Sequence, residues 1–364
     1  MKNLRNALTA LTLTFAALGH ANAEDVKITD KWSFANANPA FLPGIAFQWV
    51  GDYPALNFYK QEGIDVSWHG SQGATACIQF LLRKQVDSCV LAQDQVLLQA
   101  AQGNRLPLTF AYDYTYKITN QFAVKPNSPI KTIADLKGKK IGITSLAHDT
   151  YTFGKLVFKG LGIDENNVQF LVAGNGGQAA ELLYSGQVDA LLYYDIVWAL
   201  FDTLKKPVRV LPQPDFVDEV KAGPVVVIRT EDIEKRPETV KHFFRAFVKS
   251  TLFTIENPEA AMHIHFAMHP ETLLTGVSYK ESYERSLPQM KARLPALEKD
   301  LGGVQYYGEF NPNGWIAYVK NILGLDPTKV NPADFYTNAF AKDYNDFDEG
   351  AFRKWSREYK FEKQ

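Results

Sequence analysis

A pattern that occurs twice constrains the fold of this chain more than any other feature. Each copy has a glycine-rich turn, a short helical stretch, the tripeptide Gln-Val-Asp, an apolar strand-like run and an aspartate. The copies lie about 100 residues apart and predict two similar α/β lobes. Because open α/β sheets bind ligands at the carboxyl ends of their strands, the repeat predicts a binding cleft between the lobes. The copies comprise residues 70–74, 85–87 and Asp94, and residues 174–178, 187–189 and Asp195.

Strand-like and helical stretches alternate along most of the chain, which favours an α/β architecture. The strand-like runs are almost continuously apolar, as in sheets that are covered on both faces. Strands are expected at residues 31–35, 64–68, 88–92, 108–112, 121–124, 140–143, 168–172, 190–194 and 225–229. Helices are expected at residues 75–84, 150–160, 178–185 and 237–255. Beyond residue 256 the helical pattern continues without a linker, which predicts a helical C-terminal extension packed on one lobe.

The first 23 residues have the pattern of a secretory signal peptide. A basic start with Lys2 and Arg5 precedes an uncharged run over residues 7–18, and small residues stand at positions 21 and 23. The apolar run is shorter than the roughly 20 residues that a membrane span needs, so we expect export and cleavage after Ala23. The expected location is the periplasm of a Gram-negative bacterium, with secretion into the medium as the alternative.

Charge and cysteine content narrow the class of protein further. The chain of 364 residues has 39 Lys and Arg against 40 Asp and Glu, a net charge of −1, and no basic block that would bind nucleic acid. Cys77 and Cys89 would meet an oxidising compartment after export, so they either form a disulfide or are two buried small apolar side chains.

The sequence gives little support for a nucleotide cofactor, a metal site or a catalytic nucleophile. Residues 174–179 followed by Asp195 fit a loose dinucleotide fingerprint, but the copy that begins at Gly70 does not, so no cofactor is expected. His265 and His269 stand one helical turn apart, with His263 or Glu259 as a further metal ligand. A helix surface that carries histidines is the commoner explanation, and no metal is expected. The chain has no Gly-x-Ser-x-Gly nucleophile elbow, so we expect no enzymatic activity.

Tyrosines and one histidine favour a particular ligand. Aromatic residues concentrate at the predicted strand ends and in the segments between the lobes, where core packing explains only some of them. Together with aspartates, His148 and a shortage of arginine, they indicate a neutral or cationic ring-bearing ligand rather than a sulfonate or nitrate. These aromatic residues are Tyr112, Tyr114, Tyr116, Tyr151, Tyr193, Tyr194 and Trp198.

Several segments, in their order along the chain, resemble the periplasmic solute-binding proteins of ABC importers. The resemblance is greatest to the group that binds sulfonates, taurine, nitrate and pyrimidine precursors of thiamine. The most specific run is Ile133-Ala134-Asp135-Leu136-Lys137-Gly138-Lys139-Lys140-Ile141-Gly142, and the similarity spans about residues 31–255. The other segments that carry it are residues 59–66, 70–71, 85–87, 161–164 and 186–190.

The resemblance implies a two-lobe type II periplasmic-binding fold with a helical C-terminal extension. Residues 24–118 would form the first part of lobe 1, residues 119–224 lobe 2, and residues 225–364 the second part of lobe 1 with the extension. The crossovers would lie near residues 116–121 and 222–229. The protein would be a monomer that captures a solute in the cleft, closes on it, and delivers it to an inner-membrane permease and its ATPase.

Ligand contacts are carried over from the family or placed by the predicted strand ends, with Trp49 expected to enter the cleft. The candidate ligand residues are Asn36, Asn38, Trp49, Ser71, Gln72, Gln93, Asp94, Tyr112, Asp113, Ser145, His148, Tyr151, Asn175, Gly176, Tyr194 and Asp195. The expected ligand is a nitrogen-containing aromatic, such as a pyrimidine, with an organic anion such as a sulfonate as the alternative. An exported enzyme on the same fold is the alternative of another class.

Overall fold

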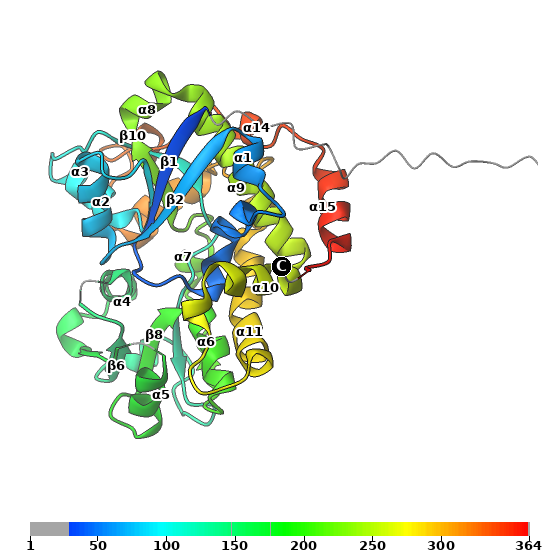
Figure 1. Cartoon of the computed structure of the whole chain (residues 1–364). Helices are drawn as coiled ribbons and strands as arrows, with labels where there is room; N and C mark the ends of the chain where they lie inside the picture. The colour runs from blue at the N-terminus through cyan, green and yellow to red at the C-terminus, as the bar shows by residue number, and fades with distance from the viewer. Residues whose placement is uncertain (1–28, 147, 175, 363–364) are drawn as a thin grey trace, which may run out of the picture.

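The computed structural model describes residues 29–146, 148–174 and 176–362, which form two five-stranded sheets (Figure 1). The predicted signal peptide lies outside these residues. The first sheet has the order β2-β1-β3-β10-β4, with β1 (Asp30–Asn36), β2 (Ile64–Gly70), β3 (Ser88–Leu91), β4 (Leu108–Asp113) and β10 (Val225–Arg229). The second has the order β7-β6-β8-β5-β9, with β5 (Asn120–Val124), β6 (Lys140–Ile143), β7 (Gln169–Val172), β8 (Ala190–Tyr194) and β9 (Arg209–Val210).

The two sheets share one topology, as the sequence repeat predicts. In each sheet, three parallel strands are followed by one strand that runs antiparallel to its neighbours, β10 in the first and β5 in the second. The antiparallel strand is the one that the chain enters after crossing from the other sheet. The chain therefore crosses between β4 and β5 and again between β9 and β10. The predicted crossovers lie in the same two regions, while the division into folding domains stays a prediction.

The helices cover the faces of the sheets and form the C-terminal region. They are α1 (Phe58–Gln61), α2 (Ala74–Leu82), α3 (Asp94–Ala101), α4 (Asp149–Gly160), α5 (Gly177–Tyr184), α6 (Asp195–Thr203), α7 (Asp215–Asp218), α8 (Thr230–Lys235), α9 (Pro237–Glu256), α10 (Pro258–Met268), α11 (Tyr279–Leu297), α12 (Lys299–Gly302), α13 (Pro312–Ala317), α14 (Ala341–Tyr344) and α15 (Glu349–Glu358). Within the described part of the chain, no helix has both the length and the apolar character to cross a bilayer.

The repeated Gln-Val-Asp tripeptide has a structural role. The Asp87 backbone N–H donates to the carbonyl of Ser33, at 2.9 Å, and its carboxylate accepts from the Ser33 N–H, at 2.8 Å. Asp189 makes the same pair of bonds to Lys140, at 2.8 and 2.9 Å. Each aspartate thus joins the strand that it precedes to the central parallel strand of its sheet, which explains why the tripeptide occurs twice.

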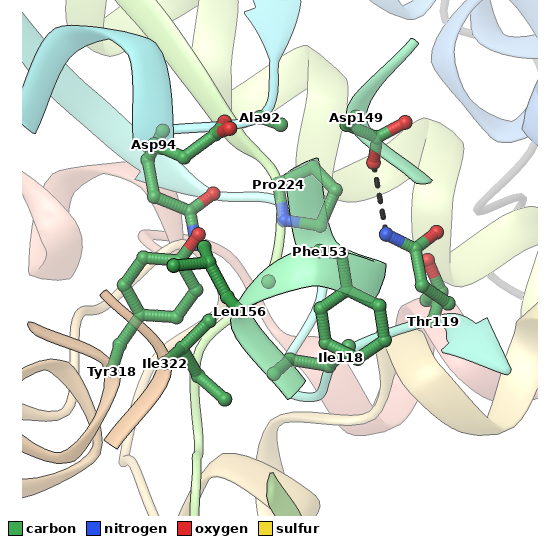
Figure 2. A pocket seen from close by; sticks show the side chains of 13 residues that line it. Ala92, Asp94, Ile118, Thr119, Asp149, Phe153, Leu156, Pro224, Tyr318 and Ile322 are labelled. Atoms are coloured by element: carbon green, nitrogen blue, oxygen red, sulfur yellow. Dashed lines mark hydrogen bonds between the residues drawn. The ribbon is translucent and has the colours of Figure 1, made fainter. Parts of the chain in front are cut away.

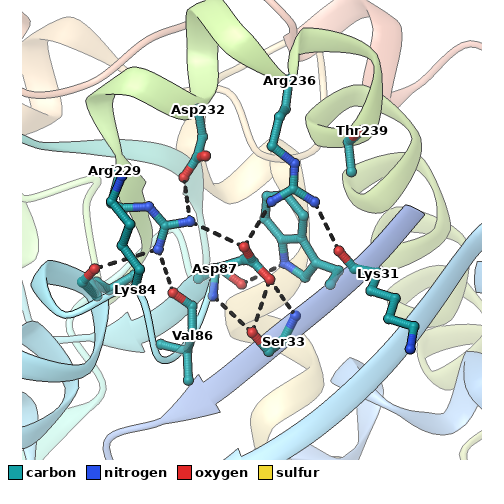
Figure 3. A network of polar contacts seen from close by, with 12 residues as sticks. Lys31, Ser33, Lys84, Val86, Asp87, Arg229, Asp232, Arg236 and Thr239 are labelled. Carbon is teal, nitrogen blue, oxygen red and sulfur yellow. Dashed lines mark hydrogen bonds and ion pairs between the residues drawn. The ribbon is translucent and has the colours of Figure 1, made fainter. Parts of the chain in front are cut away.

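In the first sheet, Asp87 also belongs to a network of ion pairs (Figure 3). Arg229 and Arg236 both donate to its Oδ1, at 3.1 and 2.8 Å. Arg229 pairs in addition with Asp232 at 2.9 Å, and Arg236 with Asp30 at 2.9 Å. The network joins β1, β10, α8 and the residue that precedes β3. Because its charges are satisfied within the lobe, we treat it as a structural feature.

The two cysteines are both buried and bonded to each other. Cys77 on α2 and Cys89 on β3 form a disulfide with their Cα atoms 6.1 Å apart, and neither residue is exposed. The two alternatives for these cysteines are therefore resolved in favour of the disulfide. It fixes the first turns of α2 against β3.

The C-terminal extension contacts both lobes, which corrects the expectation that it packs on one. Helix α11 packs on α6, which follows β8 of the second sheet, and on α10 and the 3-10 segment η1 (Pro43–Gln48), which follows β1 of the first. The π-helical turn η6 (Tyr318–Ile322) packs on α4 and α7 of the second lobe. Figure 1 shows α11 beside α6 and below α10. The extension can therefore contribute side chains to a site between the lobes.

Candidate ligand site

A cavity of about 140 Å³ lies between the two sheets, and both lobes and the C-terminal extension line it. The first lobe contributes the end of β1, the start of α2 and the end of β3, as the position of the repeated glycine-rich turn predicts. Five of the candidate ligand residues come together here: Asn36, Asn38, Asp94, His148 and Tyr194. Lining residues that sequence reasoning missed include Leu42, Ile45, Tyr114, Asn120, Asp149 and Arg293.

Three helices begin beside this cavity, and each has an aspartate as its first residue. Asp94 opens α3, Asp149 opens α4 and Asp195 opens α6. A carboxylate at a helix N-terminus interacts favourably with the helix dipole and the free N–H groups of the first turn. These positions follow β3, β6 and β8, which explains why strand-end aspartates gather at one place.

His148 and Asp149 form an ion pair in the cavity wall. His148 Nδ1 lies 2.6 Å from Asp149 Oδ1, and the Asn120 amide donates to Asp149 Oδ2 at 3.0 Å. Burial opposes both charges, but each stabilises the other, so the pKa of His148 is raised and that of Asp149 is lowered to about 2. The His148 ring also stacks on Tyr194, with centroids 5.8 Å apart. A pair of protonated His148 and ionised Asp149 is neutral in sum.

Asp94 has a different environment from its neighbour. Burial, followed by the charge of Asp149, raises the pKa of Asp94 to about 7. Its Oδ1 is buried without a hydrogen-bond partner among the described residues. Asp94 also lines a smaller cavity of about 40 Å³ with Gln93, Phe153 and Tyr318 (Figure 2). At neutral pH this carboxyl group can donate a hydrogen bond as well as accept one.

Arg293 corrects the expectation that the cleft is short of arginine. It lies on α11 of the C-terminal extension and pairs with Asp195 Oδ1 at 2.6 Å, with both side chains at least nine-tenths buried. Burial raises the pKa of Asp195 although Arg293 opposes the shift. Arg293 Nε and Asp195 Oδ2 are buried without partners within the described chain. No feature of the sequence around Arg293 distinguishes it from the other basic residues of a helix surface.

Several candidate ligand residues lie away from the main cavity. Trp49 does not enter the cleft, because it is completely buried in an apolar cluster of the first lobe. Tyr112 is buried against Phe244, and Asp113 accepts a hydrogen bond from the Trp315 indole at 3.1 Å. Tyr112 and Asp113 are buried because they stand within β4 rather than beyond its end.

The remaining candidates have local roles or lie elsewhere. The Ser71 hydroxyl donates to the Asn36 carbonyl at 2.8 Å, and Tyr151 packs edge-on against Phe170. Gln93 lines the smaller cavity but not the main one. Asp195 does not line the main cavity either, but it pairs with Arg293, which does. Those that do not line the main cavity also include Gln72, Ser145 and Gly176, while Asn175 lies outside the described residues.

The topology of the two sheets and the cavity between them define the class of fold as that of periplasmic solute-binding proteins. A protein from Bordetella bronchiseptica has the same fold, with a TM-score of 0.62 and 22% identity over 86% of this chain and 96% of that chain. The aliphatic sulphonate binding protein SsuA of Escherichia coli matches with a TM-score of 0.56 and 16% identity, over 73% of this chain and 78% of SsuA.

The sequence places the chain within one family of this class. It belongs to the NMT1/THI5 like family, which matches residues 51–261. Among curated proteins, the riboflavin-binding protein RibY of Chloroflexus aurantiacus is 23% identical over 268 residues, which cover 71% of this chain and 73% of RibY. Arg293 and the rest of α11 lie beyond the residues that match the family.

The same fold also occurs in an enzyme. The desulfurization enzyme DSZB matches with a TM-score of 0.52 and 15% identity, over 87% of this chain and 99% of the enzyme. Likeness at this level concerns the fold alone, so the chemistry of the cavity has to decide between a receptor and an enzyme.

Proposed function

We propose that this protein is the periplasmic solute-binding component of an ABC importer and that its cavity holds one neutral, nitrogen-containing aromatic ring, such as a pyrimidine. It would bind the ring without changing it covalently and deliver it, as a monomer, to the permease and ATPase. The observation that carries the proposal is the charge balance of the cavity. His148 is paired with Asp149, and Arg293 with Asp195.

Charge balance argues against a fully ionised ligand. A sulfonate would need an uncompensated cation or the free N–H groups of a helix N-terminus. The two cations named above each have an aspartate within 2.6 Å, and the three helices that begin beside the cavity each carry an aspartate as their first residue. The pKa of Asp94 is about 7, so this carboxyl group is substantially protonated at neutral pH. A buried ion without a partner costs several kcal/mol, which a neutral ring avoids.

The unpartnered polar atoms suit the edge of a heterocycle. Asn36 Oδ1 is a buried acceptor, Arg293 Nε a buried donor, and Asp94 can serve as either. Buried polar groups in native proteins are almost always hydrogen-bonded, so these atoms indicate a ligand or water with alternating donors and acceptors. A pyrimidine edge offers that alternation, and the apolar side chains of Leu42 and Ile45 can contact its ring faces.

Cavity size favours one ring over three. An apolar cavity of about 150 Å³ holds one benzene molecule, and this cavity has a volume of about 140 Å³. The tricyclic ring system of riboflavin, which RibY is named for binding, would require the cavity to open. We therefore rank a single-ring pyrimidine above a flavin.

The test is native mass spectrometry of the purified protein, followed by thermal-shift titration with cytosine, thymine, riboflavin and ethanesulfonate. A ligand at 100 times its Kd stabilises a protein by about 2.7 kcal/mol, so a binder is readily seen. We expect stabilisation by a pyrimidine, with the compound recovered intact. Stabilisation by ethanesulfonate alone would replace the proposal with a receptor for organic anions, and a chemically altered compound would replace it with an enzyme.

Asn36→Ala is the most direct variant. The Asn36 side chain lines the cavity with an unpartnered Oδ1, so its loss should weaken pyrimidine binding about tenfold with little effect on folding. Asn104→Ala is the matched control, because Asn104 is exposed, its side chain donates to the side chain of Gln99, and it lies outside the cavity. Equal Kd values for the two variants would show that the ring binds elsewhere.

A further inference from the structure

The three histidines of the α10 region separate into His263, which packs on surface tyrosines, and the neighbouring pair of His265 and His269. His263 stacks on Tyr283 with centroids 4.4 Å apart, and its Nδ1 lies 2.6 Å from the Tyr279 hydroxyl. His265 has no exposed surface, which corrects the expectation of a helix surface that carries histidines. His269 follows the last turn of α10, with 13% of its side chain exposed.

A third nitrogen-bearing ring, that of Trp49, lies beside His265 and His269. The centroids of His265 and His269 are 5.7 Å apart, and the Trp49 centroid lies 5.8 and 5.2 Å from them. Each ring has one buried nitrogen without a hydrogen-bond partner in the described chain: His265 Nδ1, His269 Nε2 and Trp49 Nε1. Even single buried polar atoms without a hydrogen-bond partner are uncommon in native proteins, so three such nitrogens in one cluster need an explanation.

Hydrogen bonds on the opposite side of each imidazole set its tautomer. The Thr272 hydroxyl donates to the His269 carbonyl at 2.6 Å, so its oxygen accepts from His265 Nε2, at 3.0 Å. The Glu271 carboxylate accepts from His269 Nδ1 at 3.0 Å. In each neutral imidazole, the nitrogen that makes the hydrogen bond then carries the ring proton. Both unpartnered imidazole nitrogens therefore carry a free lone pair.

We propose that His265 and His269 bind one copper(I) ion. Two imidazoles that share an ion, with a nitrogen–metal distance of about 2 Å on each side, have centroids at most roughly 6 Å apart. The two rings, 5.7 Å apart and tilted by 37°, leave room for one ion between them. No group of three or more His, Cys, Asp and Glu residues suited to a metal occurs in the part of the chain that the structure describes. Structural zinc takes four ligands, whereas copper(I) accepts two nitrogens.

The surroundings fit a buried monovalent ion. Phe41 stacks on His269 with centroids 4.1 Å apart, and Trp49 contacts both histidines, so the rings exclude water and can interact with a cation. Glu271 holds the distal nitrogen of His269, as carboxylates do behind metal-bound imidazoles, and increases its basicity.

The test is an anaerobic titration of the full chain with copper(I) in competition with bicinchoninate, followed by X-ray absorption. We expect one tightly bound ion with two imidazole nitrogens as neighbours. His269→Gln should weaken binding at least about 100-fold, and Glu271→Gln about 10- to 100-fold. His263→Gln is the matched control on the same helix and should bind as the unaltered protein does.

Glu271→Gln keeps the test decisive if His269→Gln fails to fold, because the Glu271 side chain is 61% exposed. Absence of a tight site, or equal affinity in His269→Gln and the unaltered protein, would overturn the proposal. One buried water that donates to both imidazoles and accepts from Trp49 would then satisfy the cluster. The titration needs no solute, so its outcome is independent of the proposed transport function.

Discussion

Asp94 should make the stability of this protein depend on pH in a defined window. Burial and the nearby charge of Asp149 raise the pKa of Asp94 from 3.8 to about 7. Between about pH 4 and pH 7 the folded state therefore holds a proton that the unfolded state has released. Stability falls as the pH rises through this window and levels off above it, because the unfolded state binds fewer protons.

The size of the effect follows from the two pKa values. Each pKa unit is worth 1.36 kcal/mol, so a change from 3.8 to about 7 corresponds to about 4 kcal/mol. Asp94→Asn has a similar shape and no titrating proton. Relative to the unaltered protein, the variant should therefore gain about 4 kcal/mol in free energy of unfolding between pH 4 and pH 8.

The assay is urea unfolding of both proteins at intervals from pH 4 to pH 8, and the quantity of interest is the difference between them. This difference in free energy of unfolding cancels the contributions of titrating groups that do not interact with Asp94. Asp52→Asn is the control, since burial raises the pKa of Asp52 to about 6 despite a hydrogen bond from Trp68. The difference in free energy of unfolding between Asp52→Asn and the unaltered protein should stop growing near pH 6, after a change of about 3 kcal/mol.

A difference between Asp94→Asn and the unaltered protein that stays constant across the range would refute the reasoning. It would mean that Asp94 is ionised in the folded state at all these pH values. The proposed hydrogen-bond donor to a neutral ring would then be lost, and a cationic ligand would become the better match to the cavity.

Two further predictions concern the elements that hold the cavity together. Replacing Cys77 and Cys89 by Ala should lower the free energy of unfolding by about 3 kcal/mol, because the disulfide closes a loop with a sequence separation of 12; calorimetry checks this, and an unchanged Tm would contradict it. Arg293→Met should cost about 3–5 kcal/mol because it leaves Asp195 buried without a partner, and adding Asp195→Asn should restore most of that loss. Urea unfolding of the single and double variants measures the recovery, and equal stability of the two would contradict it.

The strands were predictable because their signals are local, whereas the crossovers were placed from the resemblance to a known family. Apolar runs of four or five residues, such as residues 190–194, form strands with nearly the predicted bounds. The repeated tripeptide marks Asp87 and Asp189, whose carboxylates bond to equivalent strands. The glycine-rich turns indicate the strand ends that face the other lobe. These features depend on the chain within a few residues, so one sequence is enough to identify them.

The site was only partly predictable because it depends on which side chain faces which way at distant positions. Tyr112 and Tyr114 differ by two residues at the end of one strand, yet Tyr112 packs in the core and Tyr114 lines the cavity. Arg293 reaches the cavity only because α11 packs on α6, a contact between segments about 100 residues apart. The arginine lies beyond residues 51–261, the part of the chain that matches the family, so the family match does not identify it. A cavity cation that comes with its own aspartate can orient a neutral ring without selecting an anion, and this is the physical basis on which we separate a pyrimidine from a sulfonate.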